Sequence, residues 1–148
     1  DVHVYEPAGR GTAGLRDHIF YANKRGWTGG TLDVDMNVNS PVRDAVENVV
    51  WTRPIPDGDY RIEVHNYRQR ETVDVGFVVE VESAGKLSHF SYCKTVRDQQ
   101  AVRVATLRMR DGAIERVEAG DPGITASSAK PELIILCGPC GEPFAAAA

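Results

Sequence analysis

Apolar and polar side chains alternate in short segments along almost the whole chain. The segments lie at residues 1–6, 18–23, 31–37, 48–51, 60–67, 72–82, 87–94, 101–110, 113–118 and 132–137. Alternation with a period of two is typical of β-strands, and no long stretch has the spacing of an amphipathic helix. Turn sequences such as Asp-Gly at 57–58 and 111–112 separate the segments. We therefore predict an all-β fold, an antiparallel β-sandwich of the jelly-roll kind.

One segment, at residues 72–82, indicates clearly which side chains face the core. Its apolar face consists of Val73, Val75, Phe77, Val79 and Val81. We expect these side chains to be buried, because a shift of one residue would turn the whole set to solvent. The opposite face carries the charges, and there we expect exposed side chains at Asp74, Glu80 and Glu82.

The segment at residues 60–67 has an equally clear pattern. Its alternation turns Tyr60, Ile62 and Val64 inward. A polar and partly aromatic outer face is left, made of Arg61, Glu63, His65 and Tyr67.

The stretch TLDVDMNVNS at residues 31–40 has carboxylates and amides at every second position, as a calcium loop does. An EF-hand loop needs Gly at its sixth position and Glu at its twelfth, but counting from Asp33 these positions hold Val38 and Asp44. The apolar side chains between the polar ones form a continuous face. The stretch is therefore predicted to be a half-buried strand rather than an EF-hand.

The polar side of this strand remains a candidate metal site. Because neighbouring strands lie about 4.8 Å apart, His3, His18 or His65 could join Asp33 and Asp35 in a polar cluster. Such a cluster would bind a divalent ion such as calcium, or a hydroxyl-rich ligand. The competing interpretation is a solvated acidic face without a ligand.

Aromatic side chains beside polar groups suggest a second kind of site. The candidates for contact with a carbohydrate ring or a protein partner are Tyr21, Trp27, Trp51, His65 and Tyr67. Both tryptophans lie in or next to turns, so they could equally close the ends of the sandwich as core residues.

Charge and hydropathy narrow the range of partners. The 148 residues carry a formal net charge of -4, which does not provide the basic surface that nucleic acid requires. No apolar run is long enough to cross a bilayer, and the chain opens on Asp1 without a signal segment. We expect a soluble protein that binds neither nucleic acid nor membrane.

The cysteines are three in number, at Cys93, Cys137 and Cys140. An odd number argues against a scaffold in which every thiol is paired. The Cys-Gly-Pro-Cys sequence at 137–140 has the spacing of thioredoxin-like redox motifs and of half a zinc site. Both interpretations need further elements, a surrounding parallel sheet or additional ligands, and an accidental or partner-directed pair is the simpler explanation.

Six short motifs together resemble a known family. They are DVHVYEP, HIFYANK, TGGTLDVDMN, VENVVW, GDYRIEVHNY and VGFVVEVE, in this order within residues 1 to 118. The set is similar to uncharacterised bacterial and phage domains of the YfaP type, which are sometimes linked to von Willebrand A modules. The resemblance implies a β-sandwich and brings no established catalytic activity.

These observations lead to one preferred function and two alternatives. We expect residues 1–120 to be a β-sandwich domain and residues 121–148 an extension with one further strand, after a loop at 122–130. The preferred function is a non-enzymatic binding or structural module within a larger protein or an assembly such as a virion or extracellular surface structure. One alternative is a metal-dependent enzyme centred on Asp33, Asp35 and His65, and the other is a purely architectural subunit.

Overall fold

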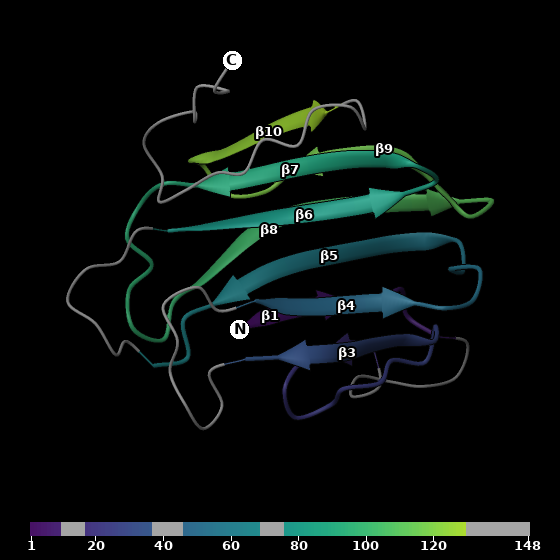
Figure 1. The fold of residues 1–148 in the computed structure, drawn as a ribbon, viewed down its shortest axis with the longest axis horizontal. Helices are drawn as coiled ribbons and strands as arrows, with labels where there is room; N and C mark the ends of the chain where they lie inside the picture. Colours follow the sequence, from purple (N-terminus) through teal and green to yellow (C-terminus); the bar gives the residue numbers. More distant parts are fainter. Residues whose placement is uncertain (10–16, 37–45, 69–75, 130–148) are drawn as a thin grey trace, which may run out of the picture.

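The fold consists of β-strands joined by turns and loops (Figure 1). A computed structural model describes residues 1–9, 17–36, 46–68 and 76–129. Within these ranges no helix is present, and hence none that could span a membrane. The strands are β1 (Val2–Tyr5), β2 (His18–Ile19), β3 (Gly30–Asp35), β4 (Glu47–Trp51), β5 (Gly58–His65), β6 (Phe77–Ser83), β7 (Lys86–Tyr92), β8 (Ala101–Arg110), β9 (Ala113–Ala119) and β10 (Ile124–Ala129).

The strands form three sheets in which every pairing is antiparallel. The largest sheet has the order β2-β1-β5-β8-β9, the second is β10-β7-β6, and the third pairs β3 with β4. In Figure 1 the two smaller sheets lie in front, with β1, β8 and β9 behind them. The predicted all-β antiparallel fold is confirmed.

The larger of two hydrophobic clusters among the described residues connects the three sheets. Its buried side chains are Val4, Ile19, Leu32, Tyr60, Ile62, Phe90, Val104, Ala105, Leu107 and Met109. They come from β1, β2, β5 and β8 of the largest sheet, from β3, and from β7. Each sheet therefore has one face against the others, which leaves the opposite face of the largest sheet to present functional side chains.

The inward and outward faces follow the predicted alternation in β5 and β6. Tyr60 and Ile62 are buried, whereas Arg61 is exposed. In β6 the residues Phe77, Val79 and Val81 pack partly buried against the core, while Val78, Glu80 and Glu82 are exposed. The predictions for Val73, Asp74 and Val75 fall outside the described residues.

Strand β3 departs from the alternation that its sequence suggested. Leu32 faces Val49 on β4 but Val34 faces Asn48, so the register shifts at Asp33, which is a β-bulge. After this shift Val34 is 37% exposed, and the Asp35 side chain is only 6% exposed. The expected continuous apolar face of Leu32, Val34 and Met36 is therefore wrong beyond Leu32.

The segment expected to be a loop at residues 122–130 contains a strand. β10 pairs with β7 along its whole length, and Ile124 packs against the core. The start of the expected extension is thus part of the main fold. The further strand predicted at 132–137 lies outside the described residues, as do Cys137 and Cys140, while Cys93 after β7 is disulfide-bonded.

Candidate functional site

Imidazole and phenyl rings gather on the outer side of β2, β1 and β5, away from the core. We call this surface the histidine–tyrosine face. It comprises His3, Tyr5, His18, Phe20, Tyr21, His65 and Tyr67.

Strand pairing explains why these rings share one side. Val4 lies opposite Ile19, and both are buried in the core. Their neighbours in sequence, Tyr5 and His18, lie opposite each other and must point the other way because strand side chains alternate. His3 lies opposite Glu63 on β5, two residues before His65. Three adjacent strands thus contribute rings to one surface.

The rings contact one another in a continuous series. His18 stacks between Tyr5 and Phe20, with centroid distances of 4.0 and 4.2 Å and interplanar angles of 11°. At the other side Tyr67 lies 5.7 Å from Tyr21 and 6.2 Å from His65, centroid to centroid. Tyr21 is 43% exposed and Tyr67 is 52% exposed. The series therefore runs from half-buried rings at Tyr5 and His18 to solvent-exposed rings at Tyr21 and Tyr67.

Burial controls the protonation of the histidines. His3 is 8% exposed, and burial, followed by the nearby His18 and His65, lowers its pKa to about 4. Burial and the charge of Arg61 also lower the pKa of His18. Nδ1 of His3 lies 2.9 Å from Nε2 of His18. Both imidazoles are therefore neutral at neutral pH, and one donates a hydrogen bond to the other.

A charged pair borders the face on β5. The Arg61 guanidinium lies 4.1 Å from the centroid of the Tyr5 ring, and its Nε is 2.9 Å from Oε1 of Glu63. Burial and the Glu63 carboxylate raise the pKa of Tyr5. The phenol of Tyr5 stays protonated, and the cation above its ring fixes one edge of the histidine–tyrosine face.

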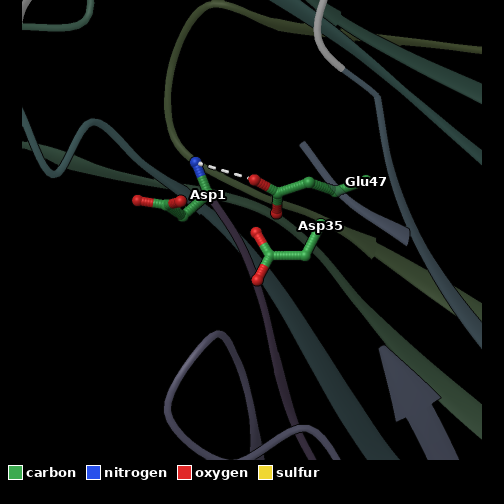
Figure 2. Close-up of side chains that lie close together, drawn as sticks. All are labelled: Asp1, Asp35 and Glu47. Atoms are coloured by element: carbon green, nitrogen blue, oxygen red, sulfur yellow. Dashed lines mark ion pairs between the residues drawn. The ribbon is translucent and has the colours of Figure 1, made fainter. Parts of the chain in front are cut away.

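A second cluster consists of carboxylates from β1, β3 and β4. One oxygen each from Asp1, Asp35 and Glu47 lies within 4.8 Å of the others, and Figure 2 shows the three side chains converging. The dashed line in Figure 2 marks the ion pair of 3.7 Å between the amino group of Asp1 and Oε1 of Glu47.

Donor groups of the protein already pair with two carboxylates of this acidic cluster. Lys24 Nζ lies 2.8 Å from Oδ2 of Asp35, and the backbone N–H of Val2 donates to Oε2 of Glu47 at 2.5 Å. Calcium needs six to eight oxygen ligands, and a lysine ammonium within the cluster competes with it for the same carboxylate. We therefore interpret the cluster as a structural link between β1 and the β3–β4 pair.

The predicted metal ligands divide between different places. Asp33 accepts a hydrogen bond from Nδ2 of Asn48 at 2.8 Å, and Asp35 belongs to the acidic cluster. His3 and His18 lie together on the histidine–tyrosine face. Among the described residues, no set of metal-ligating side chains unites Asp33 or Asp35 with a histidine. The bulge at Asp33 is the physical reason, because it turns the two carboxylates to opposite sides.

The predicted aromatic ligands also divide into two groups. Tyr21, His65 and Tyr67 meet on the histidine–tyrosine face. Trp51 instead donates from Nε1 to Thr28 Oγ1 at 2.8 Å and lies with its edge against Tyr60 in the core. Trp27 is 43% exposed and donates from Nε1 to the Pro7 carbonyl at 2.9 Å.

Glu6 organises the end of the fold around the tryptophans. Its buried carboxylate accepts a hydrogen bond from the Trp27 backbone N–H at 2.9 Å and another from the Thr28 hydroxyl. Burial raises the pKa of Glu6 despite these donors. A Cβ at Gly26 would lie 2.1 Å from Oε1 of Glu6, so a larger residue there would displace the Glu6 carboxylate. Because Thr28 also accepts the hydrogen bond from Trp51, Trp51 is linked to this buried carboxylate through Thr28. We therefore assign Trp51 a structural role.

Phe20 was not among the residues predicted for the site. The signal was present, because His18 and Phe20 are two residues apart in HIFYAN and must share a side of an extended segment. The missing information was the pairing of β2 with β1, which brings Tyr5 opposite His18.

Comparison with known proteins gives no assignment. No family model, no curated protein and no solved structure matches the chain. The resemblance to YfaP-type domains therefore stays a prediction.

Proposed function

We propose that the chain is a non-enzymatic binding module and that the histidine–tyrosine face contacts a hydroxyl-rich ligand, a carbohydrate. The observation that carries the proposal is the exposed pair Tyr21 and Tyr67 beside His65. Large exposed aromatic groups on a folded domain mark interaction surfaces more often than single scattered apolar residues do.

The chemistry of the face suits a ligand with apolar and polar sides. A tyrosine ring offers a flat apolar surface, and its hydroxyl forms hydrogen bonds with a partner. The neighbouring His65 imidazole can both donate and accept once its tautomer is set. Tyr5 and Phe20 behind them are held by stacking, so a ligand meets a surface that is already ordered.

The enzymatic alternative lacks a centre among the described residues. Asp33 binds Asn48, Asp35 binds Lys24, and His65 lies on the histidine–tyrosine face. A metal-dependent reaction needs these groups to converge on one ion. We do not pursue this alternative.

A glycan array with the purified domain tests the proposal. We expect the wild type to bind a restricted group of glycans, and Tyr67→Ala and Tyr21→Ala to lose at least tenfold in affinity. Trp27→Phe is the matched control, because Trp27 is equally exposed but lies outside the face. No glycan binding by folded wild type, or binding lost in Trp27→Phe but kept in Tyr67→Ala, contradicts the proposal.

A further inference from the structure

Three histidines from three neighbouring strands lie close together beneath the exposed tyrosines. His18 on β2 and His3 on β1 are in direct contact, with 2.9 Å between Nε2 and Nδ1. The ring of His65, at the end of β5, lies 5.4 Å from the ring of His3, edge to face. The central ring of the three is the buried one, since His3 is only 8% exposed.

His3 has no other partner for its nitrogens among the described residues. Its Nε2 is buried and forms no hydrogen bond, and its Nδ1 faces only the imidazole of His18. Leaving a buried polar atom unpaired costs on the order of 1–3 kcal/mol, so such atoms are rare and require an explanation. The unpaired atom is Nε2, whereas Nδ1, which faces His18, is the nitrogen that could bind an ion shared by the two rings.

We propose that His3 and His18 bind a late first-row transition-metal ion, with Zn²⁺ as the representative, and that His65 is the third ligand. Imidazole nitrogen suits Zn²⁺, Cu²⁺ and Ni²⁺, whereas calcium prefers oxygen. The proposal does not rest on the carbohydrate-binding function: the two share His65, but His3 and His18 lie beneath the exposed tyrosines that carry the other proposal.

The distances are close to those of a metal site. With Zn–N bonds of about 2.0–2.1 Å, two nitrogens on a tetrahedral ion lie roughly 3.3 Å apart. The His3–His18 separation of 2.9 Å therefore has to widen by only a few tenths of an ångström. His65 has to move further, because the ligand atoms of the three rings do not all lie within 4.8 Å of one another as placed. A rotation of its side chain at the end of β5 supplies that movement.

The surrounding rings support this assignment. Tyr5 and Phe20 stack on the two faces of His18 and hold its plane. Fixing the orientation of a ligand ring is what the surroundings of known metal sites do, usually through hydrogen bonds. The face thus provides two ordered ligands, His3 and His18, and a third, His65, that has to rotate toward them.

Calorimetric titration of the tag-free domain with Zn²⁺ tests the inference. We expect one ion per chain, and at least a tenfold weaker affinity in His18→Gln, which replaces a partly exposed ligand and should fold. His65→Gln should weaken binding to a smaller extent. His89→Gln is the control, because His89 lies on β7 and pairs with Glu80 at 3.2 Å. No saturable binding to folded wild type, or equal losses in His18→Gln and His89→Gln, overturns the inference.

A second measurement locates the ion. In NMR spectra of the histidine rings, Zn²⁺ should shift the signals of His3 and His18 while that of His89 stays in place. Saturable binding that leaves the His3 and His18 signals unchanged assigns the ion to other groups and overturns the inference. Either result leaves the glycan-binding test of the exposed tyrosines unaffected, so the two proposals can fail separately.

Discussion

The outer surface of the largest sheet has two halves of opposite chemistry. Over β5, β8 and β9 it carries ion pairs, with Arg108 and Asp59 joined by two bonds of 2.7 Å and Arg110 paired with Glu115 at 3.2 Å. These side chains are between 41% and 61% exposed. Over β2, β1 and β5 the same surface carries stacked rings instead.

The difference between the two halves indicates which of them is the better candidate for a ligand-binding surface. Exposed ion pairs keep a sheet face in water and contribute roughly 0–1 kcal/mol each, so their positions tolerate exchange. Neighbouring aromatic and imidazole rings serve solubility poorly, and His18 and His65 add to the effect of burial in lowering the pKa of His3. Solubility therefore does not explain the ring half, which is the part of the surface where we expect a binding function. The charged half is the surface with which it can be compared.

The largest expected contrast between the halves is in pH dependence. His3 has its pKa lowered from 6.5 to about 4 in the folded protein, so the unfolded chain takes up the proton first as the pH falls. Stability is then complete above pH 6.5 and is lost progressively down to pH 4, by about 3 kcal/mol. Urea denaturation at several pH values, with a chelator present, measures the change.

His3→Phe is the comparison variant for this experiment, because it keeps a ring and removes the titration. The difference in unfolding free energy between wild type and variant should vary across this window and level off above it. A difference that is constant from pH 4 to pH 7 would show that His3 keeps an ordinary pKa.

A smaller contrast is expected between an apolar side chain of the ring half and one at the β9 edge of the same sheet. Phe20 is half-buried and stacks on His18, so Phe20→Ala should lower the unfolding free energy by about 2 kcal/mol. Val117 on β9 lies opposite Leu107 but is 41% exposed, and Val117→Ala should cost less than about 1 kcal/mol. Chemical denaturation of both variants is the measurement, and equal losses would mean that the rings contribute nothing beyond an ordinary surface.

The smallest effect is expected from the charged half itself. The Arg108 guanidinium holds the pKa of Asp59 below its usual range, but both side chains are exposed. Asp59→Asn should change the unfolding free energy by less than about 1 kcal/mol, and the change should shrink further at 1 M salt because the charges are screened. If the unfolding free energy fell by more than about 2 kcal/mol and the loss persisted at 1 M salt, the Arg108–Asp59 pair would be required for the stability of the fold.

Alternation in the sequence was sufficient to predict the strands whose faces are uniform. β5 and β6 were located with their buried sides because valine, isoleucine and tyrosine stand at every second position. β10 was missed because its Ala and Ser residues lack β-branched side chains, and its pairing with β7 determines its conformation. The sequence pattern therefore predicted a strand only where the side chains of that strand determine its conformation. It failed where pairing with a neighbouring strand determines the conformation.

The site was predictable only in part, for two physical reasons. The alternation of residues 31–37 continues through Asp33 without a sign of the bulge, so the opposite orientations of Asp33 and Asp35 could not be read from it. The grouping of His3 with His65 depends on β1 pairing with β5, a contact between distant segments. Three of the five predicted aromatic ligands, Tyr21, His65 and Tyr67, lie together in the structure, whereas Trp27 and Trp51 lie elsewhere.

The pairing of β1 also has a consequence for how the protein acquires its structure. Val2 pairs with Val64, and Ile62 of the same strand pairs with Ala105. The first strand therefore finds its place only after β5 has emerged, and each of these pairings closes a long loop before any contact rewards it. Proteins dominated by such distant contacts fold in milliseconds to seconds. The ring surface, which straddles β2, β1 and β5, should consequently form only once synthesis has passed Tyr67.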